Sequence, residues 1–226
     1  MTNSTSSADA PYAGRSHVAY NLAGIALLLL LAAVGAAYLI DRAARNTHIT
    51  APVIDDSKSL TQTVGGQELT IPASWFRYGE QMRSGFASQV DLEVQLKLLE
   101  NGPALPVQVT LLPSNKARAS SGLLDTVYLH QFGEGTIGGY AGLVGKPLLA
   151  SDGYSGETVW YDPLSPVPFV AKCAIPVTDQ GEGRCLRTVH LPGGLAAIFT
   201  FDRTALAAWR AFDPEMARWL GQIGAL

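Results

Sequence analysis

Few residues in this chain could carry out acid–base or nucleophilic chemistry. His130 and His190 lie in the part of the chain with the pattern of a folded domain, and Asp125 lies shortly before His130. A histidine oriented by a carboxylate can activate a serine hydroxyl. No motif nominates that serine, because the sequence contains no G-x-S-x-G, S-x-x-K or H-E-x-x-H. His130, His190 and Asp125 are therefore candidate catalytic residues without an identified nucleophile, and surface or hydrogen-bonded histidines are the simpler interpretation.

A glycine-rich stretch, GEGTIGGYAGLVGKP, spans residues 133–147 and contains G-x-G-x-x-G. A dinucleotide-binding loop follows a strand and opens a helix, whereas more glycines and Pro147 follow here. A P-loop is also excluded, because Tyr140 stands where glycine is needed and Pro147 where Ser or Thr is needed. We therefore expect no phosphate cofactor. We interpret the stretch as a flexible connection between two halves of a sheet, with a candidate contact surface at Gly133, Gly135, Gly138, Gly139, Tyr140 and Lys146.

The two cysteines, Cys173 and Cys185, lie in strand-like runs separated by a polar, turn-rich loop. Two such runs predict a β-hairpin, in which the thiols can face each other across the strands. A disulfide formed there would persist only in an oxidising compartment, and two separate buried thiols are the alternative. Two cysteines without a nearby histidine do not complete a zinc site, so we expect no metal centre.

A long apolar segment precedes the domain that would position these residues. Residues 18–40 carry no charged side chain, and a helix of this length spans about 34 Å. The run exceeds the roughly 7–15-residue apolar core of a signal peptide. It therefore predicts an uncleaved anchor in the lipid bilayer, and a signal peptide cleaved near Gly35-Ala36-Ala37 is the alternative. Small residues four apart, such as Ala32 and Ala36, would also allow close helix packing and a homo-oligomer.

The chain is accordingly divided into four parts. We predict a disordered polar tail over 1–16, a transmembrane anchor over 17–41, a linker over 42–59 and an extracytoplasmic α+β domain over 60–226. The basic residues flanking the anchor slightly favour a cytoplasmic domain, but long domains translocate largely regardless of such charges. The predicted disulfide favours export. We therefore expect a single-pass protein of the bacterial inner membrane, with its N-terminus in the cytoplasm and its C-terminal domain in the periplasm.

Alternating apolar and polar residues predict an antiparallel sheet in the domain. The alternation is clearest over residues 90–99, which predict a strand with one wet face. A second alternating run over 106–113 follows a turn at Asn101-Gly102-Pro103 and is expected to pair with the first. Gly65-Gly66 is expected to form the turn of an earlier hairpin.

The second half of the domain predicts an antiparallel meander. Four strand-like runs, which begin near Glu157, Pro168, Arg184 and Leu195, are separated by turn signals. One predicted apolar face fits poorly, because it contains the charged residue Arg187. The two central runs place these residues on their core faces: Phe169, Ala171, Cys173 and Ile175 in one, and Cys185, Arg187, Val189 and Leu191 in the other.

The C-terminus changes to a helical period. Leu206, Trp209 and Phe212 recur at three-residue steps, and Asp213-Pro214 is expected to start a second, bent segment. We predict an amphipathic helix that covers one face of the sheet, and docking onto a membrane surface or a partner is the alternative. Its apolar stripe consists of Met216, Trp219, Leu220 and Ile223.

Composition and the missing catalytic motifs together indicate the functional class. The net charge of -3 offers no electrostatic field that would attract nucleic acid. We expect a strand-dominated α+β, non-catalytic accessory or interaction module of the cell envelope, which binds the bilayer through residues 18–40 and an envelope protein through its domain. An exported hydrolase with a spatially assembled site, or a small-ligand or lipid-binding domain, is the alternative.

Overall fold

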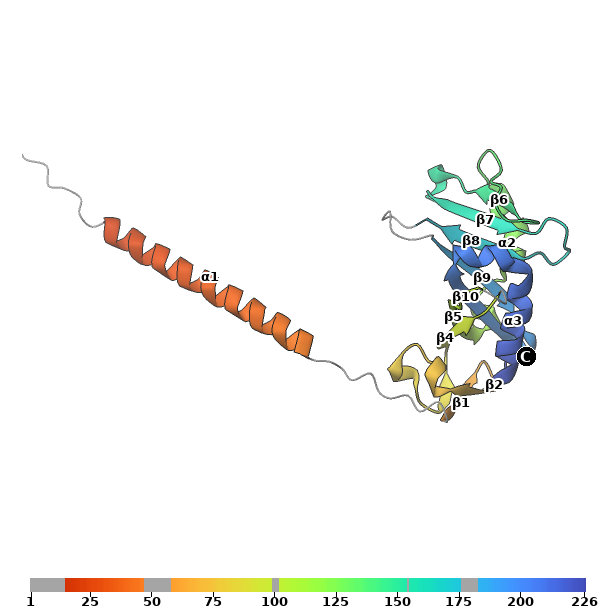
Figure 1. The fold of residues 1–226 in the computed structure, drawn as a ribbon, viewed down its shortest axis with the longest axis horizontal. Helices are drawn as coiled ribbons and strands as arrows, with labels where there is room; N and C mark the ends of the chain where they lie inside the picture. The colour runs from red at the N-terminus through yellow and green to blue at the C-terminus, as the bar shows by residue number, and fades with distance from the viewer. Residues whose placement is uncertain (1–14, 47–57, 99–101, 154, 176–182) are drawn as a thin grey trace, which may run out of the picture. The chain divides into compact units, whose positions relative to one another are not determined.

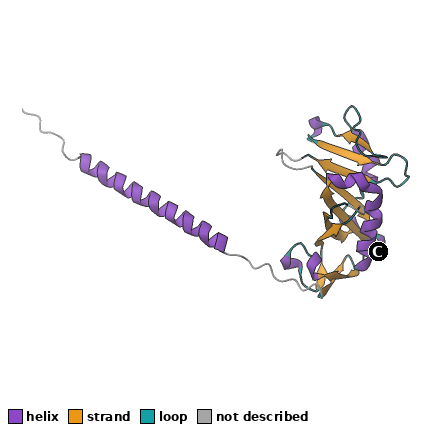
Figure 2. Cartoon of the chain, in the orientation of Figure 1, coloured by secondary structure: helices purple, strands orange, loops and turns teal. Residues whose placement is uncertain are grey.

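The computed structural model describes residues 15–46, 58–98, 102–153, 155–175 and 183–226. The chain divides into two compact units, residues 1–53 and 54–226, and each is treated by itself. Most of the predicted tail (1–16) and most of the predicted linker (42–59) lie outside the described residues. Figure 1 shows the two units, and Figure 2 shows that strands make up the body of the second.

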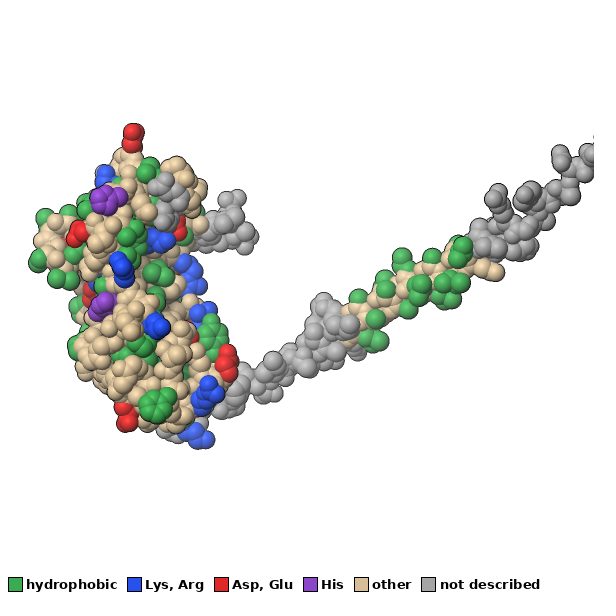
Figure 3. Space-filling view, turned by 180° about the vertical axis from the view of Figure 1, so that it is seen from behind, with side chains coloured by type: hydrophobic (Ala, Val, Ile, Leu, Met, Phe, Trp, Pro, Cys, Tyr) green, Lys and Arg blue, Asp and Glu red, His purple; other side chains and the backbone are tan. Residues whose placement is uncertain are grey.

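The first unit contains helix α1 (Arg15–Asn46). Its stretch Asn21–Leu39 is long and apolar enough to cross a membrane, as a signal sequence near an N-terminus also is. The described side chains of this stretch are exposed, and Figure 3 shows apolar atoms along it. An apolar N-terminal helix is therefore present where the anchor was predicted.

A small three-stranded sheet opens the second unit, in the order β2-β1-β3. Strands β1 (Ser59–Val64) and β2 (Gln67–Pro72) form the predicted hairpin, and Gly65 and Gly66 both adopt positive φ in its turn. Strand β3 (Gly85–Ala87) pairs parallel to β1. It was not predicted, because three residues are too few to show alternation.

A seven-stranded antiparallel sheet forms the body of the unit, in the order β4-β5-β10-β9-β8-β7-β6. It confirms the predicted pairing of the first two alternating runs and the predicted meander of the last four strands. Strand β10 also pairs with β5, and this pairing joins the two halves of the sheet. The strands are β4 (Val90–Leu96), β5 (Leu105–Pro113), β6 (Val144–Pro147), β7 (Glu157–Tyr161), β8 (Val170–Ala174), β9 (Arg184–His190) and β10 (Leu195–Asp202).

Helices cover both faces of this sheet. Helix α3 (Trp209–Gln222) is the predicted amphipathic helix, and its Phe212 ring packs 5.7 Å from that of Phe199 and 4.5 Å from that of Phe201. Helix α2 (Ser120–Thr126) packs on the opposite face, where Leu124 joins a second core cluster with Val159 and Val170. Strands β7 and β8 are thus buried on both faces, so their sequences do not alternate cleanly.

Two expectations about these elements were wrong in detail. No second helix starts at Asp213, because α3 is continuous from Trp209 to Gln222 and contains Pro214 in its interior. The Asp213 carboxylate is used in an ion pair and not as an N-cap. Ile175, predicted on the core face, lies beyond the end of β8 and is 60% exposed.

A hydrogen-bonded carboxylate connects β4 to its surroundings. Asp91 accepts hydrogen bonds from the side chains of Thr110 on β5, Gln81 and Gln89. The positive charge of Arg77 also attracts the Asp91 carboxylate. Burial by itself would raise the pKa of Asp91, but the three hydrogen bonds and Arg77 outweigh it and hold the pKa below its usual value of 3.8.

We expect Thr110→Val to raise the pKa of Asp91, because it removes one donor to the carboxylate. A folded-state pKa below the unfolded value means that the carboxylate stabilises the fold above the unfolded pKa and loses this effect as the pH falls through the folded pKa. In the variant this stabilisation is smaller, and its loss is complete at a higher pH. The titration of the Asp91 carboxyl carbon by NMR checks this, and Thr61→Val on the exposed side of β1 is the matched control. An unchanged titration in Thr110→Val would contradict the prediction.

Candidate functional site: a break in the sheet and the apolar pocket beside it

The candidate site lies where strands β8 and β9 separate. Their ladder contains only the pairs of residues 172–174 with 184–186, although both strands continue. Cys173 and Cys185 face each other in this short ladder, with Cα atoms 3.9 Å apart, and form the predicted disulfide. In the chain-entropy model, a bridge across 12 residues stabilises the fold by about 3 kcal/mol.

The Arg187 side chain on β9 bridges to β8 beyond the last of these pairs. Its side chain is buried, its Nη1 donates to the Val170 carbonyl oxygen on β8 at 3.1 Å, and its guanidinium lies 4.4 Å from the centre of the Phe169 ring. On the other face of the sheet, Thr188 N donates to Ser120 Oγ of α2 at 2.8 Å. Side chains thus replace the backbone hydrogen bonds that the ladder no longer supplies.

Asp213 on α3 neutralises this buried cation. Arg187 Nε and Nη2 donate to the two Asp213 carboxylate oxygens at 2.9 and 2.6 Å. Such a bidentate pair is geometrically specific and fixes the helix relative to the strand. The charged residue that fitted the predicted apolar face poorly is therefore the one that joins β8, β9 and α3. The sequence shows the anomaly at Arg187, but it does not identify its acceptor.

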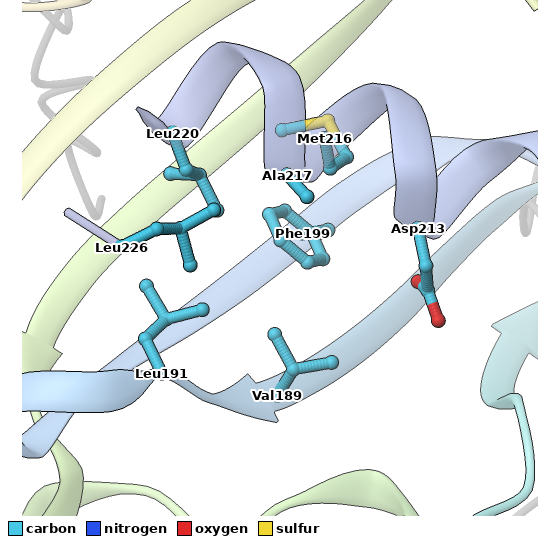
Figure 4. A pocket seen from close by; sticks show the side chains of 8 residues that line it. All are labelled: Val189, Leu191, Phe199, Asp213, Met216, Ala217, Leu220 and Leu226. Atoms are coloured by element: carbon cyan, nitrogen blue, oxygen red, sulfur yellow. The ribbon is translucent and has the colours of Figure 1, made fainter. Parts of the chain in front are cut away.

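An apolar pocket of about 210 Å³ lies beside this pair, between the sheet and α3. Figure 4 shows Met216, Ala217 and Leu220 pointing from α3 toward Phe199, Val189 and Leu191, with Leu226 at one end and Asp213 at the other. Ala217 and Leu226 are exposed, so the pocket opens to the surface. Among the described residues that line the pocket, Asp213 is the one with a charged side chain. An apolar group with a donor next to it would fit such a lining.

The candidate catalytic residues lie outside this pocket and are not joined to one another. His130 and Asp125 are both exposed, and in the described part of the chain no hydrogen bond or ion pair links them. His190 is exposed, and its Nε2 lies 2.8 Å from the carbonyl oxygen of Ala117. The structure therefore does not bring the three residues together as a triad.

The glycine-rich stretch runs along the outer edge of the large sheet. Ile137 exchanges two backbone hydrogen bonds with Gly145 on β6, and the Lys146 ammonium donates to Gly135 O at 2.9 Å. The Ala141 carbonyl accepts hydrogen bonds from the side chains of Trp209 and Arg210 at 3.0 and 3.1 Å. The preceding segment is helical, as α2 and the 3-10 turn Tyr128–His130, so no strand precedes G-x-G-x-x-G as a dinucleotide loop requires.

A close contact explains one glycine of this stretch. A Cβ on Gly145 would lie 2.7 Å from the ring of Trp160, which is fully buried, so a side chain at this position would displace the indole. Gly133, Gly135, Gly138, Gly139 and Tyr140 lie at the edge of the sheet beside it, and their role as a contact surface stays a prediction. Among the described residues, no group of three or more His, Cys, Asp or Glu is placed to hold a metal ion.

Comparison with known proteins identifies no family. No family model matches the chain, and no curated protein matches its sequence. An immunity protein of the Stenotrophomonas maltophilia type IV secretion system, a solved structure, matches at 8% identity, with a TM-score of 0.49 over 72% of this chain and 92% of that protein. Such a distant likeness carries no argument about function.

We expect Asp213→Asn to lower the free energy of unfolding by about 2 kcal/mol, because it leaves the buried Arg187 without its counter-charge. The effect stays below that of a fully buried pair, since the Asp213 side chain is 46% exposed. Urea unfolding measures it. The matched control is Glu215→Gln, which removes the partner of Arg218 on the same helix. Because the Arg218 side chain is 65% exposed and stays solvated without its partner, the urea midpoint should change much less. Equal effects of the two substitutions would contradict the prediction.

Proposed function

We propose that this chain is a single-pass, membrane-anchored accessory module of the bacterial cell envelope, whose periplasmic domain binds a partner protein and does not catalyse a reaction. The observation that carries the proposal is the pocket beside α3, which is open to the surface, apolar, and fixed by the Arg187–Asp213 pair. Residues 21–39 supply the anchor in this proposal.

Two features support an extracytoplasmic domain. The Cys173–Cys185 disulfide suggests an oxidising compartment, because reducing systems in the cytosol keep such cysteines in the thiol form. The apolar stretch of α1 has the length of a membrane span and exposes its side chains, which water solvates poorly. Together they support an anchor with the second unit on the oxidising side.

The size of the pocket favours a side chain of a protein over a free ligand. Its volume of about 210 Å³ lies below the ~300–1,000 Å³ that is usual for small-molecule sites. One leucine- or phenylalanine-sized group would fill it, as anchor residues do at protein interfaces. The Asp213 carboxylate at its end could accept a hydrogen bond from the backbone of the same partner.

The location is tested in intact cells that produce the full-length chain. If they are denatured in acid and alkylated without reductant, we expect Cys173 and Cys185 to stay unlabelled and to be labelled only after reduction, because the disulfide has formed in the native compartment. Mass spectrometry of the peptides measures this. Labelling of both thiols without reductant would contradict a periplasmic domain, as would a reporter fused after Leu226 that is active only in the cytoplasm.

Partner binding is tested by filling the pocket. With a photo-crosslinking residue at position 226, we expect the full-length protein to form a discrete adduct in cells, and Ala217→Phe to reduce its yield by about tenfold, because the new ring occupies the pocket. Gln222→Phe places the same ring at an exposed position of α3 that does not line the pocket, and should leave the adduct unchanged. An adduct that is insensitive to Ala217→Phe would contradict the proposed site.

A further inference from the structure

A second pocket, of different character, lies on the small sheet. Its volume is about 330 Å³, and its lining is mostly polar. Strand β3 forms part of its wall, as does the segment that precedes it. The lining residues are Gln62, Gln81, Arg83, Phe86, Ala87, Ser88 and Gln89.

A buried amide with an unused acceptor belongs to this lining. Gln62 shares a face of β1 with Leu60 and Val64 and is only 2% exposed. Its Nε2 donates to the carbonyl oxygens of Gln81 and Arg83 at 2.5 and 2.7 Å, and these two bonds determine which way the amide points. Its Oε1 is buried and has no hydrogen-bond partner among the described residues. A buried acceptor without a donor is costly, so this amide makes the wall of the pocket polar beneath its exposed rim.

The rim of this polar pocket offers further polar groups. Arg83 is exposed and forms no ion pair with the described acidic residues, so its guanidinium can donate to a ligand. Ser88 carries an exposed hydroxyl, which can both donate and accept. Gln89 Nε2 donates a hydrogen bond to the Asp91 carboxylate, and the side-chain oxygen of Gln89 can accept one from a ligand. The lining therefore mixes donors and acceptors, and none of its described residues is acidic.

One aromatic ring stands almost entirely in solvent beside these groups. Phe86, the middle residue of β3, is 92% exposed. An exposed ring next to a polar pocket provides a flat apolar surface on which the C–H face of a ligand can pack. A ligand that suits both features has hydroxyl groups along its edge and a face of C–H groups.

We propose that the polar pocket on the small sheet binds a saccharide, whose pyranose ring packs its C–H face on Phe86. Its hydroxyl or acetamido groups hydrogen-bond with the exposed rim residues Arg83, Ser88 and Gln89. A purely apolar ligand would leave these polar groups without partners. An extended peptide is a weaker fit, because β3 offers it the edge of only three residues. The volume of about 330 Å³ suits a small ligand.

This site is independent of the apolar pocket beside α3, and its test does not depend on the membrane topology. The full-length protein is placed in phospholipid nanodiscs, because sugar-based detergents would compete for the site. The probes are maltose and the β-1,4-linked disaccharide of N-acetylglucosamine, and their binding is followed by saturation-transfer NMR. We expect at least one disaccharide to receive saturation at its ring protons, with binding weakened about tenfold by Phe86→Ala.

Two further variants complete the experiment. Ser88→Trp fills the pocket from its exposed rim and should abolish binding without affecting the core. Leu164→Ala removes a side chain that is 90% exposed and does not line the pocket, so it should leave sugar binding unchanged. The proposal is overturned if neither disaccharide binds, if binding is the same in Phe86→Ala and in Leu164→Ala, or if a disaccharide that binds the unsubstituted protein still binds after Ser88→Trp.

Discussion

The architecture of the domain depends on how it tolerates a break between β8 and β9. The two strands pair over three residues and then separate, so backbone groups in the middle of a seven-stranded sheet have no partner on the neighbouring strand. The Arg187 guanidinium compensates on one face by bonding Val170 O and the Asp213 carboxylate, and Ser120 compensates on the other by accepting from Thr188 N. A cation is tolerated in the core because it is paired and its hydrogen bonds are used.

Side chains from α2 and α3 take part in the hydrogen bonds at this break in the sheet. Each helix supplies a side chain to the break from its own face, so the helices are positioned by specific polar contacts as well as by apolar packing. The disulfide closes the paired end of the same two strands. The same ion pair lies at one end of the apolar pocket beside α3, whose lining includes both Asp213 and Val189.

The two pockets have opposite chemistry because they belong to different sheets. The pocket beside α3 lies against the face of β9 and β10 that forms the main core, so its walls are extensions of that core. The polar pocket lies on the small sheet, where Gln62 interrupts the apolar face of β1 and the three-residue strand β3 covers little. A domain that carries an apolar pocket on one sheet and a polar pocket on another can contact two different molecules, which is consistent with the role proposed for an accessory module.

The sequence by itself determined the elements whose signal is local. Period-two alternation predicted β4 and β5, glycines marked the turn of the β1–β2 hairpin, and an uninterrupted apolar run predicted the N-terminal helix, because each depends on neighbours along the chain. The alternating runs around Cys173 and Cys185 also indicated their pairing. Only the tertiary structure decided what Arg187 contacts, that Asp213 lies inside a continuous helix, and that Gln62 carries an unused acceptor. Those properties depend on residues that are distant in sequence and meet only when the sheet and its helices pack together.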